Sequence, residues 1–419
     1  MQFSSTEKWL ARKILHRTGN PPFKLVLGRD AGEPPAKNCT GSSPTVVISD
    51  RKTLAKLALD PEIAFGDAYS DGRVEVHGNL VDFLEQLMLS MQSGGKPGLY
   101  SRMSSWWLDR VHDNTTRGSR NNIHRHYDLN VDFYKLWLDK RMVYTCAYFP
   151  TASATLEHAQ VAKMDHICRK VRLQPGDKVV EAGCGWGALA LHMAKHYGVT
   201  VKAFNISHEQ ISFGREQAKR EGLDHQVEFI EDDYRNISGR HDVFMSVGML
   251  EHVGLDHYDE MGRSIHRTIG DWGRGLLHFI GRNQPHPFSP WIRKRIFPGA
   301  YAPALSQVGR LFEPWNFSVL DVENLRMHYA KTLEHWLSRF EGSVDCVSQM
   351  FGPEFVRAWR LYLAGSIAAF RTGSLQLFQV AFAGANCKQI PWTRAHLYET
   401  QRQAAKEHNK EQKWMHATP

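Results

Sequence analysis

A glycine-rich segment, Glu181-Ala-Gly-Cys-Gly-Trp-Gly187, stands between a run typical of a β-strand and a run typical of a helix. A tight turn at such a place lets backbone N–H groups approach a bound ligand. Two ligand classes use this arrangement, and the first is a dinucleotide. Gly183, Gly185 and Ala188 satisfy the G-x-G-x-x-G/A pattern of a dinucleotide site. The acidic residue that such a site has about 20 positions further on is missing, because the next strand ends in Ala203-Phe204-Asn205.

The residue two positions before the first glycine separates the two ligand classes. Glu181 gives the pattern E-x-G-x-G-x-G, which indicates S-adenosylmethionine, because its glycines admit the methionine part of that cofactor rather than a pyrophosphate. A dinucleotide and a purely structural turn remain the alternatives. We predict no metal site and no disulfide framework, since the six cysteines show no paired spacing.

Strands and helices alternate from about residue 155 onward, which is the pattern of a doubly wound, mostly parallel α/β sheet. The expected strands cover 177–183, 199–207, 226–232, 241–249 and 274–281, and the expected helices cover 155–171, 187–198, 208–222 and 258–270. Helices over 321–340 and 353–372 and a closing strand over 375–383 follow. In such a sheet, ligands bind beyond the carboxyl ends of the strands.

The first hundred residues predict a smaller mixed α+β domain. Short β-rich runs at 23–28, 45–49 and 74–78 accompany helical runs at 53–72 and 80–91. A stretch rich in Gly, Ser, Asn and Arg follows, with one short aromatic helix around 106–111. This stretch is either a solvated linker or a basic strip that faces a membrane.

The chain of 419 residues carries 52 Lys and Arg against 44 Asp and Glu, a formal net charge of +8. A basic surface suits either nucleic acid or an anionic membrane. No apolar run is long enough to span a bilayer, and the charged N-terminus does not resemble a signal peptide. We therefore expect a cytoplasmic protein whose contact with a membrane is peripheral.

The segment VVEAGCGWGALALHMAKHYGVTVKAFNISHEQ, residues 179–210, strongly resembles the cofactor-binding segment of the cyclopropane fatty acid synthases. Further blocks with counterparts in that family extend the resemblance over roughly residues 20–388. They lie at 65–78, 126–149, 246–254, 276–281, 291–299 and 370–382. The resemblance implies a seven-stranded, Rossmann-like methyltransferase sheet.

The resemblance also implies a division of the chain. It predicts a small N-terminal domain at 1–95, a basic linker at 96–125, a catalytic methyltransferase domain with an acyl-chain tunnel at 126–392, and a charged tail at 393–419. The N-terminal domain is a candidate for lipid contact.

The family's reaction adds the methyl carbon of S-adenosylmethionine across an isolated cis double bond of an acyl chain. An unactivated alkene is a poor nucleophile, so the sulfonium must be held close and in line with it. Attack leaves a carbocation, and a base must then take a proton from the new methyl group before the ring closes. The site therefore needs a dry apolar tunnel, aromatic faces or a carboxylate near the cation, and a base.

The base implied by the resemblance is a bicarbonate ion held by donors from several segments. The matching positions are Cys146, Glu251, His278, Ile280 (through its backbone) and Tyr329. Taken one at a time, each also fits an ordinary core residue. His278 and Ile280 are two apart on an expected strand and therefore share a face.

The resemblance assigns a larger set to the cofactor, drawn from the glycine turn and from segments that follow expected strands. Gln210 would hold the ribose hydroxyls, which accounts for the missing carboxylate. The set is Tyr144, Thr145, Gly183, Gly185, Gly187, Asn205, Ile206, Gln210, Asp233 and Tyr234. Asp233 fits an ordinary surface charge as well.

The implied substrate is a phospholipid bilayer with unsaturated acyl chains, preferably anionic, met at the inner face of the membrane; a homodimer is compatible with the resemblance. A related enzyme that makes methyl- or methylene-branched chains is the main alternative, because Ser366 stands where many relatives have cysteine. Asn130-Val131 also departs from the family's usual Gly-Asn. A nucleic-acid methyltransferase is disfavoured, because the position of its D/N-P-P-Y/F tetrapeptide reads Met249-Leu250-Glu251-His252.

Overall fold

The computed structural model describes residues 4–28, 44–94 and 130–398. The expected linker at 96–125, its short aromatic helix and most of the charged tail lie outside these residues. Within the described part of the chain, no helix combines the length and apolar character needed to cross a membrane.

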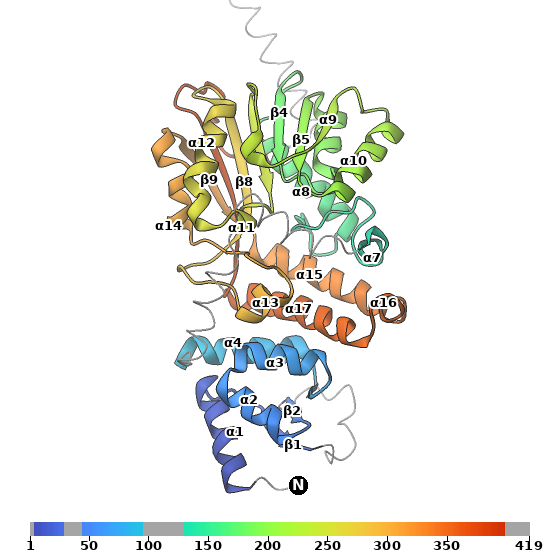
Figure 1. Ribbon diagram of the computed structural model, residues 1–419. Coiled ribbons are helices and arrows are strands. Elements are labelled where there is room, and N and C mark those ends of the chain that lie inside the picture. The colour runs from blue at the N-terminus through green and yellow to red at the C-terminus, as the bar shows by residue number, and fades with distance from the viewer. Residues whose placement is uncertain (1–3, 29–43, 95–129, 399–419) are drawn as a thin grey trace, which may run out of the picture.

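A seven-stranded sheet forms the larger part of the molecule, in the order β6-β5-β4-β7-β8-β10-β9 (Figure 1). The strands are β4 (Lys178–Ala182), β5 (Thr200–Asn205), β6 (Val227–Glu231), β7 (Val243–Val247), β8 (Arg274–Gly281), β9 (Ser318–Asn324) and β10 (Gln376–Ala383). The five strands from β6 to β8 pair in parallel, whereas β10 is antiparallel to both of its neighbours. The predicted doubly wound, mostly parallel sheet is confirmed.

Both faces of this sheet are covered by helices, as the alternation of strands and helices predicts. Val179 packs in the core formed with α8, α9 and α10, and its neighbour Val180 packs in the opposite core with α12. The covering helices are α8 (Leu156–Lys170), α9 (Ala188–Tyr197), α10 (His208–Glu221) and α12 (Tyr258–Ile269). Shorter helices are α7 (Val131–Lys135), α11 (Leu250–Val253), α13 (Pro290–Arg295) and α14 (Leu305–Val308).

The N-terminal part is a mixed α/β unit, as predicted. Its small sheet has β2 (Thr45–Ile48) between β1 (Lys24–Leu27), which is parallel to it, and β3 (Val74–His77), which is antiparallel. Its helices are α1 (Ser5–Arg17), α2 (Arg51–Leu59), α3 (Pro61–Ser70) and α4 (Leu80–Gly94). The expected helix over 53–72 is wrong as one element, because Pro61 starts a new helix that the Asp60 side chain caps.

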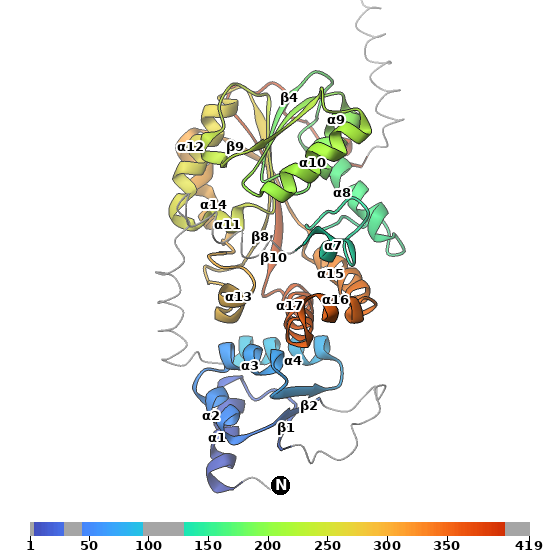
Figure 2. The ribbon, with the colours of Figure 1, turned by 45° about the vertical axis from the view of Figure 1, so that its right-hand side comes forward.

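A layer of C-terminal helices lies between the large sheet and the N-terminal part (Figures 1 and 2). It consists of α15 (Arg326–Glu341), α16 (Val344–Phe351) and α17 (Pro353–Thr372), and α17 packs against both α3 and α4. The helix expected over 321–340 is wrong at its start, because 318–324 pairs with β10 as the edge strand β9. The carboxyl ends of β4, β5, β7 and β8 point toward this helical layer (Figures 1 and 2).

Candidate active site

The turn between β4 and α9 holds three glycines in the left-handed region, with φ of +80° at Gly183, +54° at Gly185 and +87° at Gly187. A Cβ atom on Gly183 would lie 2.9 Å from Met249, and one on Gly187 would collide with the Phe229 ring. A Cβ atom on Gly185 would meet nothing within 4 Å. Packing therefore requires the first and third glycines, whereas the second borders open space.

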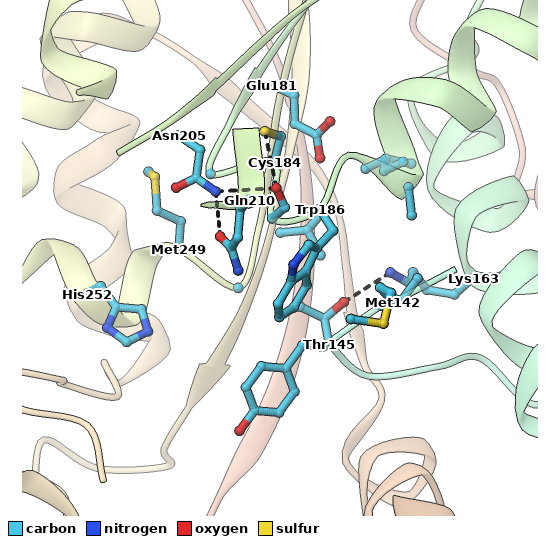
Figure 3. A pocket seen from close by; sticks show the side chains of 18 residues that line it. Met142, Thr145, Lys163, Glu181, Cys184, Trp186, Asn205, Gln210, Met249 and His252 are labelled. Carbon is cyan, nitrogen blue, oxygen red and sulfur yellow. Dashed lines mark hydrogen bonds between the residues drawn. The ribbon is translucent and has the colours of Figure 1, made fainter. Parts of the chain in front are cut away.

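That open space is a cavity of about 120 Å³ at the carboxyl ends of β4, β5 and β7 (Figure 3). Six of the predicted cofactor residues line it: Tyr144, Thr145, Gly183, Gly185, Asn205 and Gln210. Gly187, Ile206, Asp233 and Tyr234 are not among its lining residues. The Asp233 carboxylate instead accepts the Arg235 backbone N–H at 3.0 Å and lies 3.2 Å from the Arg235 guanidinium.

Two amide side chains join the glycine turn to the end of β5. Asn205 Nδ2 donates to Gln210 Oε1 at 2.7 Å and to the Gly185 carbonyl at 3.4 Å (Figure 3). Gln210 is only 4 % exposed. These bonds fix the orientation of the Gln210 amide, whose N–H₂ group is the part suited to donate to a ligand hydroxyl.

A buried cation, Lys163 on α8, also borders this cavity, and the sequence did not predict it. Its Nζ donates to Thr145 Oγ1 at 3.0 Å (Figure 3). Burial lowers the pKa of Lys163 to about 8, against the opposing effect of the Asp139, Cys146 and Glu181 side chains. Burial also raises the pKa of Glu181 to about 8, while Lys163 acts to lower it. Lys163 and Glu181 thus place two buried groups, each with a pKa of about 8, beside the glycine turn.

A sequence signal for Lys163 does exist. Gln160, Lys163 and His166 recur at intervals of three along α8, and all three are at most 2 % exposed. Gln160 Nε2 donates to the Thr145 carbonyl at 2.9 Å, so this helix face holds the segment that precedes Cys146. A polar stripe on the buried face of an amphipathic helix is therefore the pattern to look for.

A second, larger cavity of about 380 Å³ adjoins the first, and the two share Tyr144, Thr145, Gly248 and His252 as lining residues. Its walls are mainly apolar and come from the N-terminal part as well as from the C-terminal helices. They include Phe65 of α3, Leu84, Leu87, Met88 and Met91 of α4, Trp291 and Ile292 of α13, and Leu361, Tyr362, Ala369 and Phe370 of α17. Ser366 lines this cavity together with Phe370.

Glu251 of α11 presents a buried carboxylate to the second cavity. The Ile280 backbone N–H donates to its Oε1 at 2.6 Å, while its Oε2 has no hydrogen-bond partner among the described residues. Burial raises the pKa of Glu251 to about 7, although the bond from Ile280 acts to lower it. Glu251 therefore changes charge near neutral pH and keeps one oxygen for a ligand.

His278 on β8 is 2 % exposed, and its Nδ1 lies 3.0 Å from Gln379 Nε2. An amide nitrogen only donates, so Nδ1 is the acceptor and the ring proton resides on Nε2. Burial holds the pKa of His278 well below its usual value, so the ring is neutral. Its Nε2 has no hydrogen-bond partner in the described part of the chain.

Tyr329 and Cys146, the remaining predicted catalytic residues, differ in their position relative to the second cavity. Tyr329 lines the second cavity and stacks on Phe370 with ring centroids 4.6 Å apart. Cys146 is fully buried, lines neither cavity, and its Sγ donates to the Ala147 carbonyl at 3.1 Å. Burial raises the pKa of this thiol, which is therefore a neutral group. Of the five predicted catalytic positions, Glu251, Ile280 and Tyr329 line the second cavity, whereas Cys146 and His278 are buried and do not line it.

A run of aromatic rings connects the two cavities. Successive ring centroids lie 4.6 to 6.0 Å apart along the series Trp186, Tyr134, Tyr144, Trp336, Tyr329 and Phe370. Aromatic faces attract cations without offering a nucleophilic lone pair. Trp186 and Tyr144 of this series line the first cavity, and Tyr144, Tyr329 and Phe370 line the second, so their rings border the space in which a positive charge would develop.

The sheet order, its single antiparallel strand, and the glycine turn that borders a cavity define the methyltransferase class of fold. The family model for mycolic acid cyclopropane synthetase matches residues 114–380. The chain belongs to this family and is an enzyme of the cyclopropane-fatty-acyl-phospholipid synthase-like methyltransferase type.

Individual relatives agree with this assignment. A probable fatty acid methyltransferase of Pseudomonas putida is 33 % identical over 85 % of this chain and 93 % of its own length. The cyclopropane-fatty-acyl-phospholipid synthase of Escherichia coli strain K12 is 39 % identical over 62 % of this chain and 66 % of its own. Among solved structures, the cyclopropane synthase MmaA2 from Mycobacterium tuberculosis has a TM-score of 0.61 at 27 % identity, covering 63 % of this chain and 98 % of its own. The mycolic acid cyclopropane synthase CmaA1, solved with SAH and CTAB, has a TM-score of 0.60 at 29 % identity, covering 63 % of this chain and 97 % of its own.

Proposed function

We propose that this enzyme transfers a methylene carbon from S-adenosylmethionine to the cis double bond of unsaturated acyl chains in membrane phospholipids, forming cyclopropane fatty acids. The observation that carries the proposal is the junction of the two cavities at Tyr144, Thr145, Gly248 and His252. One cavity borders the glycine turn, and the other is an apolar space suited to an acyl chain.

The residues around the first cavity fit S-adenosylmethionine. Gly185 leaves room for close approach, and Asn205 and Gln210 offer amide groups at the end of β5. When bound, the cofactor supplies an electrophilic methyl carbon. The relative CmaA1 has been solved in complex with SAH, which supports S-adenosylmethionine as the cofactor here.

Glu251, on the wall of the second cavity, and His278, on β8, fit a small anion that both donates and accepts hydrogen bonds. Glu251 Oε2 is a buried acceptor and His278 Nε2–H is a buried donor, and neither has a partner among the described residues. Bicarbonate supplies one O–H and further acceptor oxygens, so it would satisfy both atoms. Glu251 and His278 would thereby hold a proton acceptor close to the new methyl group, while Tyr329 and the Glu251 charge stabilise the cation. Cys146 would add only backbone and packing contacts.

The decisive experiment is expression in bacterial cells rich in unsaturated phospholipid, followed by gas chromatography and mass spectrometry of the fatty acids. We expect fatty acids that are one CH₂ heavier than the unsaturated substrates and that carry a cyclopropane ring in place of the double bond. Cells expressing Glu251→Gln provide the background. Methyl- or methylene-branched chains in place of rings would contradict the proposal and would identify the branched-chain enzyme.

We further propose that the enzyme meets its substrate at the cytoplasmic face of the membrane, attracted by its basic surface. Lys and Arg side chains near an anionic bilayer contribute about 1 kcal/mol each, and salt screens this attraction. Co-sedimentation with anionic vesicles should therefore fall as salt rises and as neutral lipid replaces anionic lipid. Equal binding to neutral and anionic vesicles at every salt concentration would refute this part of the proposal.

A further inference from the structure

Arg282 follows directly after β8 and forms part of the wall of the larger, apolar cavity. Ile280, whose backbone N–H bonds to Glu251, stands only two residues earlier. Along an extended strand this separates the two Cα atoms by about 6.6 Å. A permanent cation is thus attached to the same strand end that holds the buried carboxylate.

The guanidinium of Arg282 has no anionic partner in the described part of the chain. Its Nη1 donates to the Ser374 carbonyl at 3.4 Å, its Cζ lies 5.7 Å from the Phe288 ring centroid, and its Nε is buried without a partner. Burial lowers the pKa of Arg282 to about 10, and the Tyr301 side chain acts to raise it.

Other arginines that are withdrawn from solvent are paired differently. The Arg274 guanidinium lies 2.5 Å from Asp177, and that of Arg235 lies 3.2 Å from Asp233. A partly buried charge without a counterion costs free energy, which a paired charge recovers. An anion bound beside Arg282 would therefore lower the free energy of this buried charge, and the cavity that Arg282 lines has room for one.

The position of Arg282 indicates where that anion comes from. Arg282 contacts the backbone carbonyl of Ser374. The Ser374 Oγ in turn accepts a hydrogen bond from Gln92 Nε2 at 2.8 Å, and Gln92 follows Met91 at the end of α4. Met91 is 37 % exposed although it lines the cavity, and the lining residue Ser289 is also exposed. This end of the cavity therefore opens to solvent, where the polar end of an acyl lipid would remain.

We propose that Arg282 binds the phosphodiester of the phospholipid substrate, while the acyl chain extends along the apolar walls toward Glu251. This inference rests on the proposed function, because it assumes that the cavity receives an acyl chain. A guanidinium can bind two phosphate oxygens at once, and such charge-assisted bonds are among the stronger hydrogen bonds in proteins. Arg282 would then fix the distance between the headgroup and the reacting carbons.

Equilibrium binding of three soluble probes tests the proposal. The probes carry the same cis-unsaturated acyl chain below its micelle concentration: a lysophospholipid, a monoacylglycerol without phosphate, and the free fatty acid. Arg282→Gln removes the charge but can still donate to Ser374. Lys294→Gln, at an exposed position of α13, removes the same charge near the cavity and is the matched control.

The wild-type protein and Lys294→Gln should bind the lysophospholipid about tenfold or more tightly than the monoacylglycerol. Arg282→Gln should lose this preference and keep its affinity for the monoacylglycerol. A preference that survives in Arg282→Gln, or an equal loss for all probes with an unchanged melting temperature, would overturn the proposal. A wild-type preference for the fatty acid that Arg282→Gln removes would overturn it too, because the anion would then be a carboxylate. Because the readout is binding, a protein that shows the expected preference but makes no cyclopropane would refute the proposed function alone.

Discussion

Glu251→Gln should lower the rate of lipid conversion by about a hundredfold or more while leaving the affinity for S-adenosylmethionine nearly unchanged. The amide oxygen can still accept the Ile280 N–H, so the local fold is kept. The other carboxylate oxygen becomes an N–H₂ group. This group can neither accept a hydrogen bond from an O–H group of a ligand nor stabilise a cation. Loss of one positioned electrostatic group costs this much in comparable sites.

The pH dependence gives a second readout for the same residue. Since burial raises the pKa of Glu251 to about 7, the carboxylate forms as pH rises through that value, and the wild-type rate should rise with it. The pH–rate profile of Glu251→Gln should lack this rise.

The same pKa shift affects stability. The raised pKa means that the folded state favours the protonated form of Glu251, so this group's contribution to stability is present below about pH 4.5 and is lost as pH rises through 7. The neutral variant should therefore melt no lower than the wild type above pH 7.

Steady-state turnover on unsaturated vesicles, calorimetric titration of the cofactor and thermal melting together check this prediction. Glu354→Gln, an exposed position in the first turn of α17, is the matched control and should behave as the wild type. If Glu251→Gln kept most of its activity, with or without added bicarbonate, the assignment of this carboxylate to the chemistry would be wrong.

Gly185→Val should weaken S-adenosylmethionine binding by at least about a hundredfold, which corresponds to about 2.8 kcal/mol. The structure leaves open space where the side chain would project, so the valine collides with the ligand rather than with the protein. The φ of +54° adds strain for a branched side chain. That strain alone would lower stability without any specific effect on ligand affinity.

Gly222→Val separates these two effects. Gly222 ends α10 with a φ of +67°, a Cβ atom there would also meet nothing within 4 Å, and it does not line the cofactor cavity. This variant should lose stability but retain cofactor affinity in calorimetry at a temperature where both variants are folded. Equal affinities of Gly185→Val and the wild type would exclude the cofactor from this turn.

The fold was largely predictable because its signals are local. The parallel strands carry apolar residues at their buried positions, and the alternation with helices specifies the sheet. Glu251 follows β7, and Ile280 lies on β8, which pairs directly with β7. Two neighbouring parallel strands bring such residues to one edge, so their meeting at 2.6 Å follows from topology.

What the sequence did not predict depends on packing between distant segments. Lys163 belongs to a polar stripe of α8 that resembles a solvated helix face in the sequence, and only the packing of α8 buries it. Asp233 has the right place after β6, but the neighbouring Arg235 engages its carboxylate. The edge strand β9 forms only because β10 presents an open edge to it. The contribution of α3 and α4 to the apolar cavity joins residues almost three hundred positions apart, such as Leu84 and Phe370.

This shared cavity has a consequence for the folding of the whole molecule. Phe65 and Leu87 on one side, and Leu361 and Phe370 on the other, are apolar side chains that face a space instead of one another. The contact nearby is close, because a Cβ atom on Gly66 of α3 would collide with the Trp291 indole. An acyl chain in that space would be the missing layer of a hydrophobic core, buried against both parts at once. A ligand stabilises the state to which it binds. A lipid bound to both parts would therefore couple the unfolding of the N-terminal part to the unfolding of the large sheet.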